Sequence, residues 1–215
     1  MVKKITLVLS LSLLIITGFY YFVINPTIEV YSEGDLIKDD YILNSDVGIV
    51  SGKEMAENKL IVYSDYNCIA CKDFHNMLTE NDEITKLIES GFISITYKDL
   101  GTSKHNSKNA AKAALAAHDQ GAYTSMQEIL FSNEDWLKDS DESIFYHYAA
   151  QLNLDIDEFD KSFDSKKIVK ELKNIKDEFD SLGAIGTPIL IYNERIYNGA
   201  PKDIENFLTI LNADN

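Results

Sequence analysis

The sequence predicts one α/β domain that carries an inserted block of helices and is preceded by an N-terminal membrane-spanning helix. Short apolar runs typical of strands alternate with longer stretches in which apolar residues recur at helical spacing. Between about residues 104 and 165 only helical patterns occur, so the predicted order is β-α-β, a helical block, and then α-β-β-α. A chain of 215 residues has room for one such domain plus a targeting segment.

Residues 1–24 are predicted to be a signal anchor that crosses the cell membrane once. Lys3 and Lys4 precede an apolar stretch at 5–24, and twenty helical residues cover about 30 Å, the hydrocarbon thickness of a bilayer. The lysines favour a cytoplasmic N-terminus, which makes the rest of the chain extracytoplasmic. A cleaved signal peptide is the alternative, but bulky aromatic residues stand at 19–22, where cleavage needs small ones.

Residues 25–55 are polar and acidic, and we expect them to form an extracytoplasmic linker with a short strand near 47–50. The main domain is predicted at 56–215. It begins with a buried strand at 60–63, and apolar residues then follow helical spacing from 69 to 88.

The remaining elements follow from the same two periodicities. An alternating strand is predicted at 92–97, and the insertion that follows is rich in alanine and other helix formers. After the insertion, a long amphipathic helix at 166–182 precedes a β-hairpin and a last amphipathic helix. The helices of the insertion are expected around 110–117, 123–131, 143–152 and 156–163, and the hairpin strands at 189–192 and 195–197.

The composition excludes some classes of partner. Hydrophobic residues make up 45% of the chain, which is enough for a core. Twenty Lys and Arg against 35 Asp and Glu give a formal net charge of −15. Nucleic-acid binding needs a concentrated positive surface, so we expect no nucleic-acid partner. Contact with the membrane is expected only through the N-terminal helix.

The two cysteines of the chain form a C-x-x-C pair, Cys68 and Cys71, just after the strand at 60–63. Cys68 is therefore expected at a helix N-terminus, where unpaired N–H groups and the helix dipole stabilise an anion. A thiolate is such an anion and is the form that attacks disulfides. We expect Cys68 to be the nucleophile and Cys71 the resolving thiol of a redox-active disulfide. A purely structural disulfide is disfavoured, because so short a loop restrains little chain.

Four segments of the chain resemble the bacterial DsbA-type thioredoxin-fold oxidoreductases, particularly the membrane-tethered thiol–disulfide oxidoreductases of Gram-positive bacteria. The ordered combination of C-x-x-C with a distant Gly-Thr-Pro before a hairpin is the specific part of the match. The segments are 62–68 with 71–75, 97–100 leading to 109–114, 126–131, and 182–188 with 197–200.

The resemblance implies a thioredoxin fold with a helical insertion, and oxidation of cysteines in exported proteins. It also implies a cis bond between Thr187 and Pro188, with the backbone before the proline free to pair with an extended substrate. Without the resemblance, Pro188 would be read as an ordinary strand-initiating proline. Reoxidation is expected from a quinone-linked membrane partner or from small oxidants, and no cofactor is expected.

The sequence departs from the pattern of the family in two ways. Ile69 and Ala70 stand between the cysteines, where the best-known oxidant of the family has Pro-His, so the resemblance implies a weaker oxidant here. Val62 stands six residues before Cys68, where many thioredoxin-fold enzymes bury an acid that moves protons for the resolving thiol. Asp65 or a water is a candidate substitute.

Other functions remain open from the sequence. The direction of thiol–disulfide exchange depends on the reduction potential of the cysteine pair, so a reductase or an isomerase is a close alternative to an oxidase. From another class, a metallochaperone could bind Cu(I) or Zn(II) through Cys68, Cys71 and His75, with a further donor such as His105. A catalytically quiet binding domain is a third alternative, although it would not need both cysteines and the Thr187-Pro188 pair.

Overall fold

The computed structural model describes residues 31–43, 46–102, 106–138 and 141–212. The predicted signal anchor at 1–24 lies outside these ranges. Within them, no helix combines the length and the apolar character that a membrane crossing requires.

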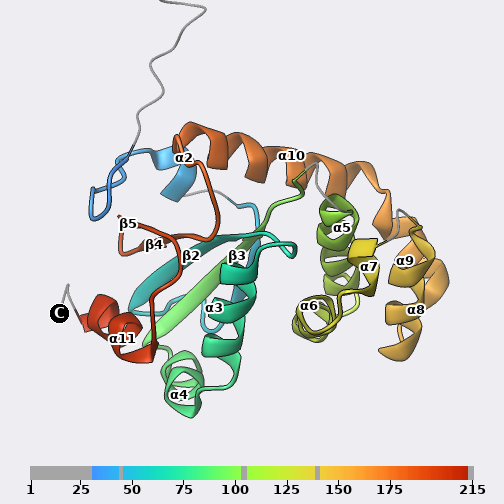
Figure 1. Cartoon of the computed structure of the whole chain (residues 1–215), viewed down its shortest axis with the longest axis horizontal. Helices are drawn as coiled ribbons and strands as arrows, with labels where there is room; N and C mark the ends of the chain where they lie inside the picture. Colours follow the sequence, from blue (N-terminus) through green and yellow to red (C-terminus); the bar gives the residue numbers. More distant parts are fainter. Residues whose placement is uncertain (1–30, 44–45, 103–105, 139–140, 213–215) are drawn as a thin grey trace, which may run out of the picture.

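A five-stranded mixed sheet forms the centre of the domain, in the order β1-β3-β2-β4-β5 (Figure 1). β2 and β3 run parallel, and the other neighbouring strands pair antiparallel. In this register Val62 lies opposite Tyr97 on one side and Leu190 on the other. The strands are β1 (Ile49–Ser51), β2 (Asn58–Ser64), β3 (Ile93–Asp99), β4 (Ile189–Tyr192) and β5 (Arg195–Asn198).

Helices cover both faces of the sheet because the strands alternate apolar side chains on both sides. Leu60 and Val62 of β2 face one core, with the helices α3 (Ile69–Thr79), α4 (Asp82–Ser90) and α11 (Ile204–Asn212). Ile61 and Tyr63 face the other core, with α2 (Asp40–Leu43) and α10 (Lys166–Ser181). Figure 1 shows α10 running over the sheet and on to the insertion.

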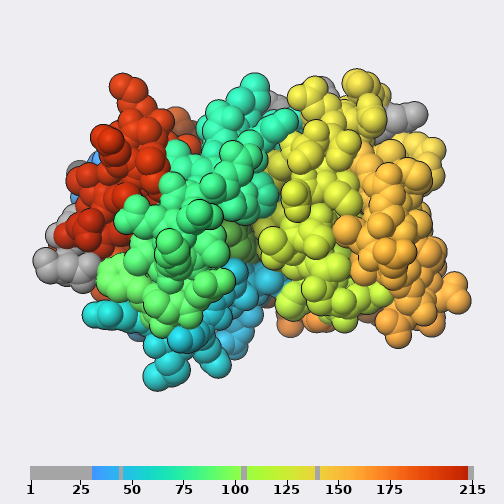
Figure 2. Space-filling model, turned by 90° about the horizontal axis from the view of Figure 1, so that it is seen from below, coloured from blue at the N-terminus to red at the C-terminus, as the bar shows by residue number. Residues whose placement is uncertain are grey.

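The insertion is helical, as predicted, and its core also takes in Tyr66 and Cys71 from the cysteine turn and α3. Its alanine-rich helix α5 is almost entirely buried, because small side chains let neighbouring helices approach closely. Figure 2 shows the yellow and orange residues of the insertion gathered on one side of the molecule, beside the green residues of the sheet domain. Its helices are α5 (Ser107–His118), α6 (Tyr123–Ser132), α7 (Asp135–Lys138), α8 (Ser143–Gln151) and α9 (Ile156–Phe163).

The helical stretch expected from 69 to 88 is two helices, α3 and α4, rather than one. Asn81 ends the continuity, because its side-chain oxygen accepts the N–H groups of Glu83 at 2.9 Å and Ile84 at 3.2 Å and caps α4. An asparagine followed by two acidic residues is a typical helix start. The apolar periodicity continues across the break and conceals it.

Part of the segment expected to be a linker belongs to the domain. Ile37 and Ile42 are buried in the core beneath α10. β1, close to the short strand expected at 47–50, extends the sheet by pairing with β3. Residues from 31 onward therefore help to close the fold, and residues 25–30 lie outside the described ranges.

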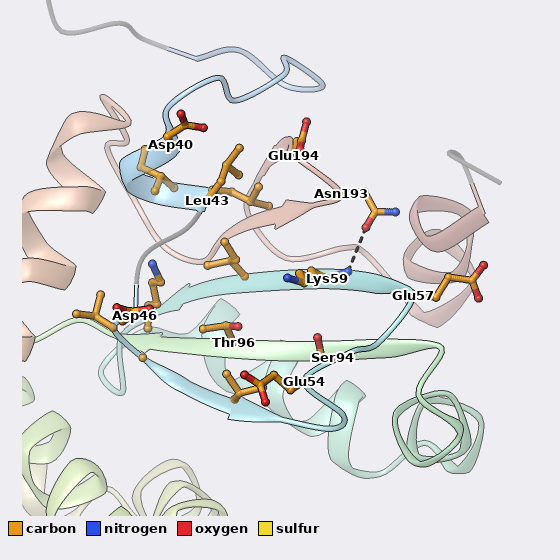
Figure 3. A pocket seen from close by; sticks show the side chains of 17 residues that line it. Asp40, Leu43, Asp46, Glu54, Glu57, Lys59, Ser94, Thr96, Asn193 and Glu194 are labelled. Atoms are coloured by element: carbon orange, nitrogen blue, oxygen red, sulfur yellow. Dashed lines mark hydrogen bonds between the residues drawn. The ribbon is translucent and has the colours of Figure 1, made fainter.

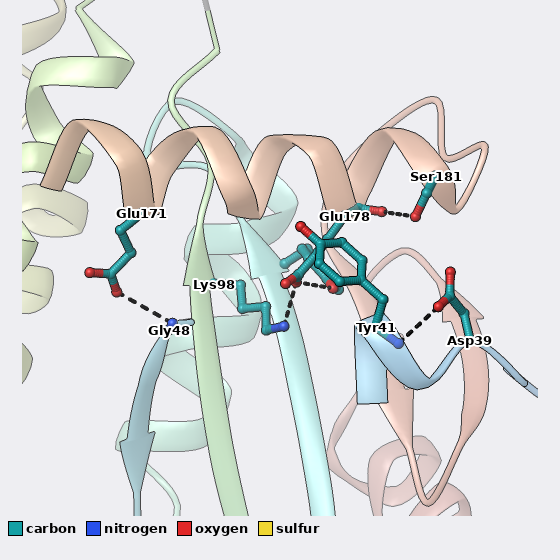
Figure 4. Close-up of polar contacts among 8 residues, drawn as sticks. Asp39, Tyr41, Gly48, Lys98, Glu171, Glu178 and Ser181 are labelled. Atoms are coloured by element: carbon teal, nitrogen blue, oxygen red, sulfur yellow. Dashed lines mark hydrogen bonds and ion pairs between the residues drawn. The ribbon is translucent and has the colours of Figure 1, made fainter. Parts of the chain in front are cut away.

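A buried ion pair joins α10 to the sheet (Figure 4). The ammonium group of Lys98, on β3, contacts the Glu178 carboxylate, and both side chains are almost fully buried. The Tyr63 hydroxyl donates a second hydrogen bond to the same carboxylate at 3.0 Å. Because each charge is compensated inside the core, the pair fixes the position of α10 over β2 and β3.

Candidate functional site

Cys68 is the N-cap residue of α3, at the end of the turn that follows β2. Its sulfur accepts the backbone N–H of Cys71 at 3.4 Å, and its own N–H donates to the Asp65 carbonyl at 3.0 Å. Its backbone is extended, with φ −101° and ψ 119°, as is usual for an N-cap. The sulfur therefore lies at the unpaired N–H groups of the first helical turn, as the sequence predicted.

Thr187 and Pro188 lie beside this sulfur, although they are far away in the sequence. When it is protonated, the Cys68 thiol donates a hydrogen bond to the Thr187 carbonyl oxygen at 3.2 Å. The Thr187–Pro188 peptide bond is cis, as the family resemblance implied. The structure thus brings together all four residues predicted for the site, namely Cys68, Cys71, Thr187 and Pro188.

The two thiols differ strongly in acidity. The hydrogen bond from the Cys71 side chain is the main cause that lowers the pKa of Cys68 to about 6. Partial burial opposes this shift, while the backbone N–H groups of Ala70 and Cys71 support it. Burial raises the pKa of the Cys71 thiol. At neutral pH the site therefore holds a thiolate at Cys68 beside a protonated Cys71, which is the arrangement that a nucleophile and a resolving thiol require.

The buried carboxylate of Asp65 fixes the turn that leads to Cys68. One oxygen accepts the Asn67 N–H at 2.8 Å, and the other accepts the Ser107 hydroxyl at 2.7 Å and the Thr102 N–H at 3.2 Å. Ser107 begins α5, so these bonds tie the cysteine turn to the start of the insertion. Asp65, a candidate substitute for the acid missing at Val62, is thus occupied by three donors.

A second buried acid, Asp99, was not predicted by the sequence as a site residue. One of its oxygens accepts hydrogen bonds from the hydroxyls of Tyr66 at 2.9 Å and Tyr123 at 2.8 Å. Burial raises the pKa of Asp99 to about 7, although the two tyrosine donors lower it. Since Tyr66 belongs to the cysteine turn and Tyr123 to α6, this network is a second connection between the site and the insertion.

His75 lies one turn after Cys71 on α3 and packs its ring on Phe131, with 4.7 Å between ring centroids. Burial lowers the pKa of His75 to about 4, so the ring is neutral at physiological pH. Among the described residues, no three His, Cys, Asp or Glu side chains are arranged to hold a metal ion. His105, the further donor considered for a metal site, lies outside the described ranges. The described geometry therefore gives no support to the metallochaperone alternative.

A large hollow lies away from the cysteine site (Figure 3). This cavity of about 820 Å³ opens beside α2, on the same face of the sheet as α10, and Lys59, Ser94 and Thr96 are among its lining residues. Acidic side chains surround it, including Asp46 and Glu194. None of its lining residues belongs to the cysteine site, so the hollow is not the place where the sulfur chemistry occurs.

A sequence model of the family described as Thioredoxin matches residues 44–213. Among solved structures, the thiol-disulfide exchange protein alpha-DsbA2 from Wolbachia pipientis has a TM-score of 0.68 at 27% identity, covering 82% of this chain and 91% of that protein. The catalytic domain of Proteus mirabilis ScsC has a TM-score of 0.64 at 23% identity, covering 81% of this chain and 92% of that one. At 23% identity, the similarity to ScsC shows only that the two proteins share a fold.

Curated relatives include two Na(+)/H(+) antiporters. NhaA 3 of Salinispora tropica is 28% identical over 158 residues, which are 73% of this chain and 23% of the antiporter. NhaA 1 of Mycolicibacterium gilvum is 26% identical over 167 residues, which are 76% of this chain and 26% of the antiporter. The chain thus spans about a quarter of the length of these relatives.

The family match covers most of the chain, and the fold presents the C-x-x-C pair in a DsbA-like setting. The chain therefore belongs to the thioredoxin family.

Proposed function

We propose that the chain oxidises cysteine pairs in exported proteins, outside the cell membrane, through a Cys68–Cys71 disulfide. The observation that carries this proposal is the place of the Cys68 sulfur at the start of α3, where it accepts the Cys71 N–H at 3.4 Å and where its pKa is lowered to about 6. A thiolate held at the helix start stabilises the reduced form of the pair, and a stabilised reduced form makes the disulfide a better oxidant. The direction of exchange that this acidity favours is therefore removal of electrons from clients.

The proposed cycle balances in two exchange steps. A client thiolate attacks the Cys68 sulfur of the oxidised pair, so that a mixed disulfide forms and Cys71 leaves and takes up a proton. A second client thiolate then attacks the client sulfur of the mixed disulfide and releases Cys68 as a thiolate. The client has lost two electrons and the pair has gained them. A quinone-linked membrane partner or a small-molecule oxidant is proposed to accept these electrons.

Thr187 and Pro188 are proposed to bind the client chain. The Thr187 carbonyl lies 3.2 Å from the reactive sulfur, where an extended client segment would pass. Backbone pairing at this position would hold many unrelated sequences, because it reads the main chain rather than side chains. Ion antiport is not part of the proposal, because the chain spans only about a quarter of the antiporter relatives.

The reduction potential of the pair tests the direction of exchange. We expect the full-length protein, equilibrated with glutathione buffers, to be more oxidising than thioredoxin at about −270 mV and less oxidising than DsbA at about −120 mV. The upper bound follows from Ile69 and Ala70, which provide no charge or side-chain hydrogen bond to the thiolate. A value at or below that of thioredoxin would contradict an oxidase and would favour a reductase.

The proposed location depends on residues 1–24. We expect the protein to be retained in the membrane fraction with the mass of the uncleaved chain, because 19–22 offer no small residues for a signal peptidase. Mass spectrometry of the mature protein, together with protease added outside intact cells, measures both retention and orientation. A shortened, freely released protein would overturn the anchor and leave the sulfur chemistry in place.

A further inference from the structure

Asp65 interacts with both cysteines through its backbone. Its carbonyl oxygen accepts the Cys68 N–H at 3.0 Å, which closes the turn directly in front of α3. Burial raises the pKa of Cys71, and the Asp65 N–H is among the groups that oppose this shift. A displacement of the Asp65 backbone would therefore move groups that face both sulfurs.

The side chain of Asp65 holds this backbone in place within the turn. One carboxylate oxygen accepts the Asn67 N–H at 2.8 Å. A side-chain bond to the N–H two residues later is an Asx turn, which sets the direction in which the chain leaves the turn. Asp65 is only 3% exposed, so water competes little for this bond.

The second carboxylate oxygen of Asp65 reaches out of the turn to the start of the insertion. It accepts the Ser107 hydroxyl at 2.7 Å and the Thr102 N–H at 3.2 Å. Ser107 is the first residue of α5 and is fully buried. The segment before α5 runs close to this helix, because a Cβ atom added at Gly101 would lie 2.8 Å from the Lys108 Cα atom. The turn is therefore anchored to a closely packed part of the molecule.

The same contacts argue against Asp65 as the proton carrier that would replace the acid missing at Val62. All three side-chain hydrogen bonds are donated to the carboxylate, which suits the ionised form, an acceptor only. A residue that carried protons for Cys71 would have to give up some of these bonds in every cycle. The arrangement suits a residue that holds the turn.

We propose that Asp65 is a positioning residue, which keeps the Cys68 sulfur at the first N–H groups of α3 by anchoring the cysteine turn to the insertion through Ser107. The inference rests on the proposed function, because it concerns the reactivity of the same sulfur. Hydrogen bonds weaken steeply when their geometry is lost. A released turn would therefore hold the thiolate less well, so the insertion helps to set the acidity of a cysteine outside it.

The Asp65→Asn variant tests this role through the sign of one shift. Iodoacetamide alkylation of the reduced full-length protein, followed across pH by mass spectrometry, gives the titration midpoint of Cys68, expected near pH 6 in the wild-type protein. Asparagine removes a negative charge from the turn, and this change alone should lower the midpoint. Loss of the anchor should raise it. We expect a net rise of about one pH unit, because a hydrogen bond to a charged group corresponds to about one to two pKa units.

Ser107→Ala is a milder second variant, which keeps the charge of Asp65 and removes one donor from the anchor. We expect it to raise the midpoint by about half a pH unit. Glu178→Gln, which neutralises a buried acid on α10, and Ser94→Ala, which truncates a buried serine on β3, are the matched controls. Both should keep the wild-type midpoint. Circular dichroism at each pH shows that the compared proteins are folded.

The outcomes separate this inference from the proposed function. A lower midpoint in Asp65→Asn, or an unchanged midpoint in Ser107→Ala, would overturn the positioning role and leave the sulfur chemistry in place. An equal rise in the Glu178→Gln control would also overturn it, because the loss of any buried acid would then have the same effect. If the wild-type midpoint is that of a free cysteine, at about 8.5, the proposed function loses its support and the positioning role fails with it.

Discussion

The Cys68→Ser variant is expected to lose client oxidation by roughly a thousandfold or more, because it removes the group that forms the covalent intermediate. The measurement is regain of activity by a reduced, disulfide-requiring protein in a glutathione buffer, compared with the same buffer without enzyme. Serine is close to cysteine in size, and its hydroxyl oxygen can cap α3 in place of the Cys68 sulfur, so the fold should be retained. Full activity in this variant would refute the assignment of the nucleophile.

The Cys71→Ser variant is the matched comparison and should behave differently. Cys71 is buried, and its thiol is protonated because burial raises its pKa. Without it, a mixed disulfide with Cys68 cannot be resolved from inside the site. Mixed with a client that carries a disulfide, the reduced variant should attack it through the Cys68 thiolate and release one client thiol. We expect the client joined to Cys68 to accumulate and to be visible as a thiol-sensitive adduct. Its absence would indicate that Cys68 does not exchange with clients.

The acidity of Cys68 also predicts how the alkylation of this thiol depends on pH. The rate at which iodoacetamide alkylates the reduced wild-type protein should be half-maximal near pH 6, since the thiolate is the reactive form. The Cys71 side chain is the main cause of that low pKa. In a Cys71→Ala variant, which has no donor at this position, the midpoint should therefore move to higher pH.

The local parts of the site could be predicted from the sequence, and its assembly could not. A strand followed by C-x-x-C and a helix places Cys68 at a helix start through short-range rules alone. That Thr187 would meet Cys68 followed from a family resemblance, because no local pattern relates residues 119 positions apart. The same holds for the cis bond at Pro188, which physical reading alone would have placed in an ordinary strand start.

Long-range polar contacts explain most of what the sequence concealed. Lys98 lies in a strand where alternation would allow its charge to face solvent, yet it is buried against Glu178, 80 residues later. Asp99 meets Tyr66 and Tyr123 only because the insertion folds back onto the cysteine turn. The break between α3 and α4 at Asn81 is different, because the capping signal of Asn81 is local and could have been read from the sequence. The apolar periodicity, which continues across the break, favoured a single helix instead.

The Asp99→Asn variant is expected to be more stable than the wild-type protein above pH 7, by up to about 4 kcal/mol. Asp99 is 2% exposed, and its pKa is raised from 3.8 to about 7, chiefly by burial, with the carboxylates of Asp65 and Glu171 adding to the shift. Each pKa unit corresponds to about 1.4 kcal/mol. Asparagine keeps an oxygen that can accept the hydroxyls of Tyr66 and Tyr123, but it brings no charge into the core.

The sign follows from proton binding. Between about pH 4 and 7 the folded protein holds a proton on Asp99 that the unfolded chain has released, so this group stabilises the fold at low pH. That contribution falls as pH rises through this window and is lost above pH 7. Urea unfolding at pH 4.5, 6 and 8 should therefore show that the free energy of unfolding of the variant, relative to that of the wild-type protein, increases as pH rises.

Asp157→Asn, which changes an exposed aspartate on α9, provides the control. Because this side chain lies in water, the variant and the wild-type protein should show the same change in unfolding free energy between these pH values. Equal pH dependence in the wild-type protein and in Asp99→Asn would show that Asp99 is ionised in the fold throughout this range. The connection between the cysteine turn and the insertion would then be a charged one, held by its tyrosine donors at every pH in which the enzyme works.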